Sequence, residues 1–309
     1  LSGCFNAEDS ILGVKVYLNE VEYKPLDPKE IIRIYICDNS FELPITLRLN
    51  RNKIKLEYKT EAGTFNDETE VIYNADIGKF YGLIIGIEAY EDKGITPLSE
   101  PVNDAYKLNN ILTKNYNFNP ENIKVLKNPT KEQIVAELTK LRQTITKEDN
   151  VLIFYAGHGH WDEEMNQGYW LPSNAKGDNN SNWLSNSDLT DHLKVIRSRH
   201  TLVISDACFS GAIFKTRSAF GKNLAIEKLY NLPSRKAITS GTLKEVPDRS
   251  VFMQYLTSRL NSNPEKYLSA EQLFSSLRVP VLQNSPNVPQ YGPIYNTGDE
   301  GGDFIFMKN

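Results

Sequence analysis

The first 78 residues alternate between apolar and polar side chains in several short stretches. Strict alternation of this kind is typical of β-strands that bury one face. No helical repeat of comparable strength is present in this region. We therefore predict a small antiparallel sandwich or sheet over residues 1–78, in which nothing looks catalytic. The apolar members of the stretches are Val14, Val16 and Leu18, then Ile32, Ile34 and Ile36, then Leu47 and Leu49, and finally Ile54, Leu56 and Tyr58.

From Phe80 onward, continuous apolar runs alternate with amphipathic segments. The alternation indicates an α/β fold, in which a mostly parallel sheet is flanked by helices on both faces. We assign residues 79–309 to this second domain. Thr130 and Gln133 form a capping-box pair that starts one of its helices. The strands are predicted near residues 83–87, 123–126, 151–155, 201–204 and 236–239, and the helices near 105–112, 134–145, 189–196 and 252–260.

Two of these predicted strands end in reactive side chains that stand among small residues. His158 lies in residues 155–159 (YAGHG), and Cys208 lies in residues 205–211 (SDACFSG). In α/β sheets the functional residues collect just beyond the carboxyl ends of the strands. A cysteine and a histidine together form a sufficient nucleophile and base, because the imidazole favours the reactive thiolate. The two side chains are therefore candidates for nucleophilic catalysis.

Both segments resemble the caspase-like cysteine peptidases, and the match is closest to bacterial members of the metacaspase type. The histidine precedes the cysteine by 50 residues, which is the separation found in caspases. Further segments resemble the family in the same order, from about residue 80 to residue 309. They are residues 81–87, 102–105 (VNDA), 238–242 (ITSGT) with 250–252, and 301–306 (GGDFIF) as the closing strand. The N-terminal β region lies outside the resemblance.

The resemblance implies a role for each residue of the site. Cys208 is the nucleophile, and His158 is the general base and then the acid that protonates the departing amine. The oxyanion hole consists of the backbone N–H groups of Cys208 and Gly159. In this family, backbone contacts hold the imidazole, so no third catalytic side chain is expected.

Two aspartates determine the expected substrate preference. Caspases have a glutamine two residues before the nucleophile, whereas this chain has Asp206, as metacaspases do. Asp104 falls where metacaspases place a second acidic residue of the pocket. Two carboxylates in one pocket would repel an aspartate and pair with a guanidinium or an ammonium group. We therefore expect cleavage after Arg or Lys, with Arg preferred, and helix or turn capping is the alternative role for both aspartates.

Composition excludes several other classes of protein. Hydrophobic residues at 40% make the chain too apolar for a disordered protein, and a formal net charge of −4 argues against a strongly basic nucleic-acid-binding module. No apolar run approaches the ~20 residues of a transmembrane helix. The cysteines are too few and too scattered for a disulfide framework, and His158, His160 and Asp162 lack further ligands for a metal site. We expect no cofactor and no metal.

Two properties stay open. Calcium-dependent metacaspases have an acidic residue seven positions after the cysteine, where this chain has Lys215, so calcium activation lacks support without being excluded. Residues 1–4 (LSGC) resemble a bacterial lipobox, although such a signal needs a leader ahead of it. A cytoplasmic location is the expectation, and a lipid-anchored extracytoplasmic location is the alternative if residues 1–4 are a lipobox.

The sequence therefore predicts a cysteine endopeptidase that acts on protein or peptide substrates with Arg or Lys before the cleaved bond. The basic residues Lys215, Arg217 and Lys222 suggest self-processing, with a solvated loop as the alternative. Whether the protein requires an activating partner protein is left open. The leading alternative function is an inactive caspase-like scaffold that binds proteins, and a third is a hydrolase or transferase acting on a non-peptide acyl group.

Overall fold

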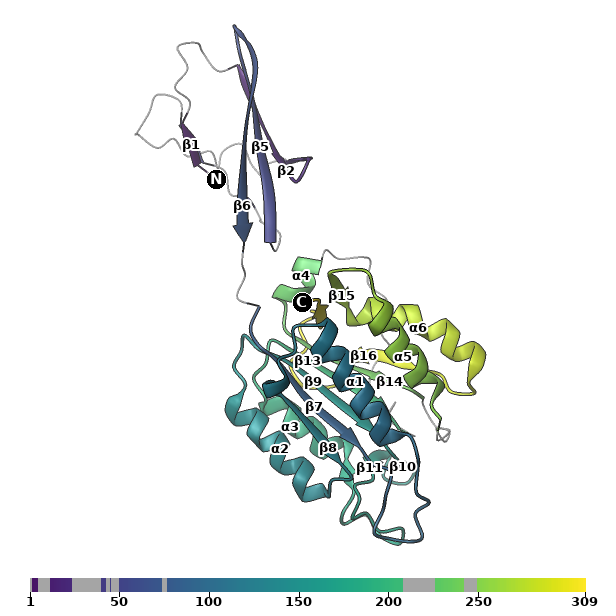
Figure 1. Ribbon diagram of the computed structural model, residues 1–309. Helices are drawn as coiled ribbons and strands as arrows, with labels where there is room; N and C mark the ends of the chain where they lie inside the picture. Colours follow the sequence, from purple (N-terminus) through teal and green to yellow (C-terminus); the bar gives the residue numbers. More distant parts are fainter. Residues whose placement is uncertain are drawn as a thin grey trace. The chain divides into compact units, whose positions relative to one another are not determined.

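The chain forms two compact units, Leu1–Ile77 and Gly78–Asn309. The computed structural model in Figure 1 describes residues 2–4, 12–23, 40–42, 45, 50–73, 77–207, 226–241 and 249–309. Several residues singled out in the sequence lie outside these ranges. They are the alternating stretches at 32–36 and 47–49, the candidate nucleophile Cys208, and the basic residues Lys215, Arg217 and Lys222.

The described part of the first unit is all β, as the alternating pattern predicts. Its main sheet is four-stranded and antiparallel, with the strand order β3–β2–β5–β6, and a second pair of strands joins β1 to β4. Val16, Leu18 and Ile54 form the buried core of the main sheet. The strands are β1 (Ser2–Cys4), β2 (Gly13–Leu18), β3 (Val21–Tyr23), β4 (Ser40–Glu42), β5 (Asn50–Thr60) and β6 (Gly63–Tyr73).

The second unit is built on a six-stranded sheet with the order β16–β14–β13–β9–β7–β8. Neighbouring strands are parallel except for β16, which pairs antiparallel with β14. This arrangement confirms the predicted mostly parallel sheet. The strands are β7 (Phe80–Gly86), β8 (Ile123–Lys127), β9 (Asn150–Ala156), β13 (His200–Asp206), β14 (Ser234–Thr239) and β16 (Gln290–Pro293).

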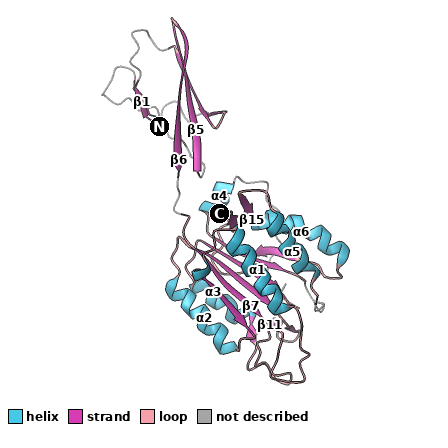
Figure 2. Cartoon of the chain, in the orientation of Figure 1, coloured by secondary structure: helices cyan, strands magenta, loops and turns pink. Residues whose placement is uncertain are grey.

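Helices cover both faces of this sheet (Figures 1 and 2). On one face α1 packs on β7 and β9 and contacts α5, which contacts α6; on the other face α2 packs beside α3. The predicted capping box is present, because the Thr130 hydroxyl accepts from the Gln133 N–H and the Gln133 side chain accepts from the Thr130 N–H. The helices are α1 (Pro101–Asn115), α2 (Lys131–Thr144), α3 (Asn186–Val195), α4 (Ile226–Asn231), α5 (Val251–Ser262) and α6 (Ala270–Asn284), with a 3₁₀ turn, η2, at Pro120–Asn122.

Alternation along each strand decides which side chains face which helices. Ile153, Tyr155 and Val203 lie in the buried cluster that includes side chains of α2 and α3. Side chains one position away point to the opposite face of a strand. Ile204 and Asp206 of β13 therefore point toward the face that carries α1 and α5.

Two smaller sheets complete the second unit. A three-stranded antiparallel sheet has the order β10–β11–β12, and β15 pairs antiparallel with β17. The closing segment 301–306 thus contributes to β17. His160 lies in β10. The strands are β10 (Gly159–Asp162), β11 (Gln167–Trp170), β12 (Leu184–Ser185), β15 (Tyr267–Ser269) and β17 (Ile305–Met307).

Within the described ranges, none of the helices combines the length and the apolar character that crossing a membrane requires.

Gly86, at the end of β7, allows α1 to approach the sheet closely. A Cβ atom at this position would lie 2.6 Å from the Pro101 carbonyl oxygen and 2.8 Å from the Val102 Cα, which are backbone atoms that cannot rotate away. We expect Gly86→Ala to lower the free energy of unfolding by about 1–3 kcal/mol, as overpacking does in other proteins. Urea denaturation of the purified protein measures this change.

Gly177→Ala is the matched control, because a Cβ atom there would meet only the Asp92 Oδ2 atom, at 3.9 Å. Equal stability of the two variants would contradict the close approach of α1 to β7.

Candidate active site

The pairing of β9 with β13 brings the two predicted catalytic segments to the same edge of the sheet. Ala156 and Asp206 form the last pair of this parallel ladder. The Gly157 N–H then donates to the Asp206 carbonyl oxygen at 3.4 Å. His158 follows directly, and Cys208 comes two residues after Asp206, outside the described residues. The structure therefore places the candidate base but not the candidate nucleophile.

Main-chain contacts orient the half-buried imidazole of His158. Its Nε2 atom lies 2.8 Å from the Thr96 carbonyl oxygen. Because a carbonyl oxygen only accepts, Nε2 carries the proton in this contact, and Nδ1 of the neutral ring keeps a free lone pair. The His158 ring also packs on the Tyr90 ring, with 5.3 Å between the centroids. This is the kind of backbone support that the resemblance implies for the histidine.

Two tyrosine hydroxyls hold the backbone of His158. The His158 N–H donates to the Tyr90 hydroxyl at 2.9 Å, and the Tyr155 hydroxyl donates to the His158 carbonyl oxygen at 2.6 Å. Tyr155 is itself fixed, because its ring stacks on Trp170 with 4.3 Å between the centroids. Gly157 must be small here, since a Cβ atom would lie 2.9 Å from the Tyr155 hydroxyl oxygen. The small residues around His158 thus make room for the groups that position it.

The main-chain N–H of Gly159 points away from the neighbouring strand. The Leu171 N–H donates to the His158 carbonyl oxygen at 3.1 Å, and Gly159 pairs with Trp170 in the antiparallel ladder. In such a ladder, alternate residues direct both main-chain groups to the partner strand, and the residues between direct them outward. His158 and His160 therefore bond toward β11, and Gly159 presents its N–H on the open side of β10.

Asp206 is buried, and its surroundings disfavour the ionised carboxylate. Its side chain is 5% exposed, and its Oδ1 atom has no hydrogen-bond partner within the described ranges. Burial, and to a smaller extent the charge of Asp104, raises the pKa of Asp206 to about 6, although the hydroxyls of Ser240 and Ser250 oppose the rise. A buried carboxylate of this kind binds a cationic group favourably.

Asp104 lies in the first turn of α1 and is 7% exposed. Its charge contributes to the raised pKa of Asp206. Lys107 approaches Asp104 at 3.1 Å, and the Lys107 side chain is half exposed. The N-cap of α1 is Glu100, so Asp104 does not occupy the capping position that was its alternative role. Asp104 and Asp206 are thus both buried on the face of the sheet that carries α1.

Further buried polar groups went unnoticed in the sequence. The hydroxyls of Ser205 and Thr239 are buried at the ends of β13 and β14 and find no hydrogen-bond partner among the described residues. Serine and threonine carry no distinctive spacing signal, so only the fold reveals that these hydroxyls are buried. In the described part of the chain, no group of three His, Cys, Asp or Glu side chains is arranged to hold a metal ion.

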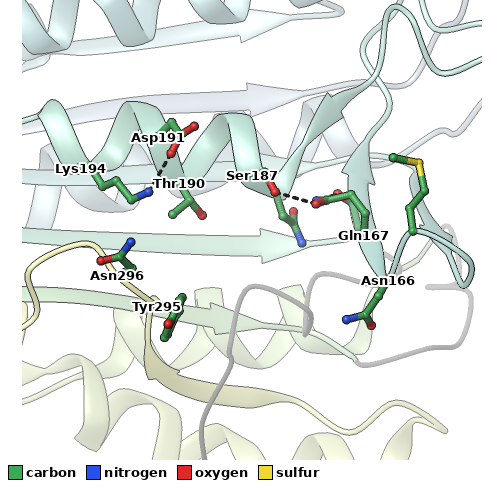
Figure 3. Close-up of a pocket in the computed structure, with 11 residues that line it drawn as sticks. Asn166, Gln167, Ser187, Thr190, Asp191, Lys194, Tyr295 and Asn296 are labelled. Carbon is green, nitrogen blue, oxygen red and sulfur yellow. Dashed lines mark hydrogen bonds and ion pairs between the residues drawn. The ribbon is translucent and has the colours of Figure 1, made fainter.

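A polar hollow on the second unit contains none of the four predicted site residues that the structure describes (Figure 3). Two interactions cross its wall: the Ser187 hydroxyl donates to Gln167 at 2.7 Å, and Lys194 pairs with Asp191 at 2.8 Å. The hollow is therefore separate from the site around His158. Its lining comes from the turn between β10 and β11, from β11, from α3 and from the loop after β16, and comprises Met165, Asn166, Gln167, Gly168, Asn186, Ser187, Thr190, Asp191, Lys194, Tyr295 and Asn296.

Solved structures share the fold of the second unit at low sequence identity. A protein of Geobacter sulfurreducens is 15% identical with a TM-score of 0.51, and the match covers 73% of this chain and 99% of that one. Caspase-1 of Spodoptera frugiperda is 15% identical with a TM-score of 0.52, covering 72% and 92%. The Drosophila initiator caspase Dronc is 11% identical with a TM-score of 0.52, covering 73% and 83%. These similarities establish a caspase-like fold.

Sequence comparison identifies the family. No curated protein sequence matches the chain significantly. The family model for the caspase domain of the C14 peptidases, however, matches residues 79–292, which is more than half of the chain and includes His158, Asp206 and Cys208. The chain therefore belongs to the caspase-domain family of cysteine peptidases.

Proposed function

We propose that the protein is a cysteine endopeptidase that cleaves peptide bonds after Arg, and less rapidly after Lys. The observation that carries the proposal is the pair of buried carboxylates, Asp206 and Asp104, beside a histidine that main-chain groups hold in place. The caspase domain supplies the class of chemistry, and these side chains supply the preference for a cationic substrate.

The chain connectivity supports a dyad of Cys208 and His158. Ala156 and Asp206 are paired across two parallel strands, and His158 and Cys208 each follow their strand by two residues. In the proposed reaction, Nδ1 of His158 takes the proton of the Cys208 thiol, and the thiolate attacks the substrate carbonyl carbon. The imidazolium then protonates the departing amine, and water hydrolyses the thioester that remains.

The outward N–H of Gly159 suits the proposed oxyanion hole. As the carbonyl carbon becomes tetrahedral, its oxygen gains negative charge that a fixed N–H donor stabilises without reorganisation. The direction of the Gly159 N–H follows from the ladder between β10 and β11, so the donor is in place before substrate binds. The N–H of Cys208 is the second donor in this proposal.

Burial of the acidic pair explains why the pocket favours a cation. Ionisation of Asp206 is unfavourable because burial and the charge of Asp104 both oppose it. A guanidinium group placed between the two carboxylates would donate several hydrogen bonds and neutralise this repulsion. An aspartate side chain would add a third negative charge to the same site. The proposed specificity is therefore the reverse of that of enzymes that cut after aspartate.

The same specificity makes the basic residues Lys215, Arg217 and Lys222 candidates for self-cleavage. They follow Cys208 in the sequence and lie outside the described residues. A shift of the native chain to two bands on a denaturing gel, absent from Cys208→Ala, is the expected result. A single band for both proteins would contradict self-processing and leave the cleavage of other substrates unaffected.

The main test compares initial cleavage rates on matched fluorogenic peptides that end in Arg, Lys or Asp, with and without calcium. We expect the Arg peptide to be cleaved fastest, the Asp peptide not to be cleaved, and calcium to have no effect. Cys208→Ala should abolish all cleavage, because it removes the nucleophile. Cleavage after Asp would overturn the role of the acidic pair, and the absence of any cleavage would favour the inactive scaffold.

Asp206→Asn should separate stability from activity. Because the folded-state pKa of Asp206 is about 6 and its ordinary value is 3.8, the contribution of this group to stability is complete below about pH 3.8 and is lost as the pH rises through about 6. At pH 7.5 the ionised form therefore costs about 3 kcal/mol. We expect Asp206→Asn to raise the free energy of unfolding at pH 7.5 by up to this amount, and less at pH 4.5.

The same substitution should lower kcat/KM for the Arg peptide by about 100-fold, because it removes one member of a buried charge pair. Asp178→Asn, at an exposed loop position, is the control and should change neither quantity. Loss of stability together with activity in Asp206→Asn would show that Asp206 supports the fold rather than the pocket.

A further inference from the structure

We propose that the outer edge of β10 binds the segment of substrate that follows the cleaved bond, as an added β-strand. The inference rests on the proposed function and extends it to the leaving half of the substrate. An extended peptide adds readily to an exposed sheet edge, where main-chain hydrogen bonds supply the affinity. The proposal depends on three features: an unpaired edge, its orientation, and its position beside His158.

The edge is unpaired within the described ranges. The small sheet has the order β10–β11–β12, so β10 has a partner on one side only. Because His160 and Asp162 bond toward β11, the main-chain N–H and C=O groups of Gly159 and Trp161 point outward. No described residue occupies these four groups. The side chains along the strand range from half-buried to exposed, so the strand lies at the surface.

The position of β10 matches the leaving half of the substrate. The acidic pair lies on the face of the sheet that carries α1, and it receives the side chain before the cleaved bond in the proposed function. β11, the partner of β10, packs through Trp170 on Tyr155, which belongs to the opposite face. His158 directly precedes β10 in the chain and, in the proposed function, protonates the leaving amine, so the departing segment passes on its side. β10 begins at the next residue.

The spacing of the outward groups fits a peptide parallel to β10. In a parallel pair, each residue of the added strand bonds to two residues of its neighbour that are two positions apart. The carbonyl oxygen of the cleaved bond accepts from the Gly159 N–H, as in the proposed oxyanion hole. The second residue after the cleaved bond then donates its N–H to the Gly159 carbonyl and accepts from the Trp161 N–H. Residues beyond it continue the strand.

Binding to a catalytically inactive protein tests this arrangement. Fluorescein-labelled peptides of one sequence are compared by anisotropy on the Cys208→Ala protein: one ends in Arg-amide, and the other continues for three alanines after the Arg. We expect the longer peptide to bind about tenfold more tightly, the gain expected from two additional hydrogen bonds. N-methylation of the second alanine should reduce this gain to about threefold, because it removes one of those bonds.

Trp161→Pro removes the outward N–H of β10 without removing a bond of the ladder, since proline is tolerated at edge-strand positions whose N–H faces outward. Trp161→Ala is the matched control, because it also removes the indole but keeps the N–H. The ratio of long-peptide to short-peptide affinity should be about threefold lower in Trp161→Pro than in Trp161→Ala. The thermal midpoints of both variants show whether each remains folded.

Two results would overturn the proposal: equal affinity for the long and the short peptide, or equal ratios in Trp161→Pro and Trp161→Ala. Absence of binding by either peptide would overturn it as well. The measurement does not require catalysis, so it is independent of whether the native chain cleaves the longer peptide. Cleavage without an affinity gain contradicts the added strand alone, whereas an affinity gain without cleavage contradicts the endopeptidase alone.

Discussion

The in-register pairing of β9 with β13 is the constraint on which the candidate site depends. Seven consecutive pairs, from Asn150 with His200 to Ala156 with Asp206, join two strands that are buried along their whole length. Both strands therefore end at the same level, at Ala156 and Asp206. The main-chain hydrogen bonds between β9 and β13 fix the positions from which the two catalytic segments start. Nearby loops then only have to orient the side chains.

Tyr155 links the sheet to this orientation. Its ring belongs to the buried cluster beneath α2 and α3 and stacks on Trp170 of the small sheet, while its hydroxyl holds the His158 carbonyl. One side chain thus connects the main sheet, the small sheet and the imidazole. On the opposite face, one oxygen of the buried Asp206 carboxylate has no hydrogen-bond partner among the described residues. The candidate site thus combines a histidine that neighbouring groups hold in place with a carboxylate whose ionisation is opposed by burial.

Sequence patterns predicted those parts of the second unit that depend on side-chain type. The strands around Leu83, Ile153 and Val203 are long apolar runs, and helix α2 starts at a capping box, so the main sheet and most of its helices were predictable. Helix α6 was missed because a proline within a helical pattern normally ends the helix and Pro280 lies inside this one, and β10–β12 were missed because each is only two to four residues long. The Thr96 carbonyl that holds His158 leaves no sequence signal, because every residue carries a carbonyl group.

The face on which Asp206 emerges depends on the number of residues in β13. Because successive side chains of a strand alternate, one residue inserted or deleted upstream of Asp206 in this strand would turn its carboxylate toward α2 and α3, away from Asp104. An insertion in the turn between β5 and β6 of the first unit would not turn any strand residue to the opposite face. Among related chains, a change of one residue in the length of β13 would therefore separate the two carboxylates, even where every residue of the motif is retained. In this strand, the number of residues determines where the carboxylate points as much as residue identity does.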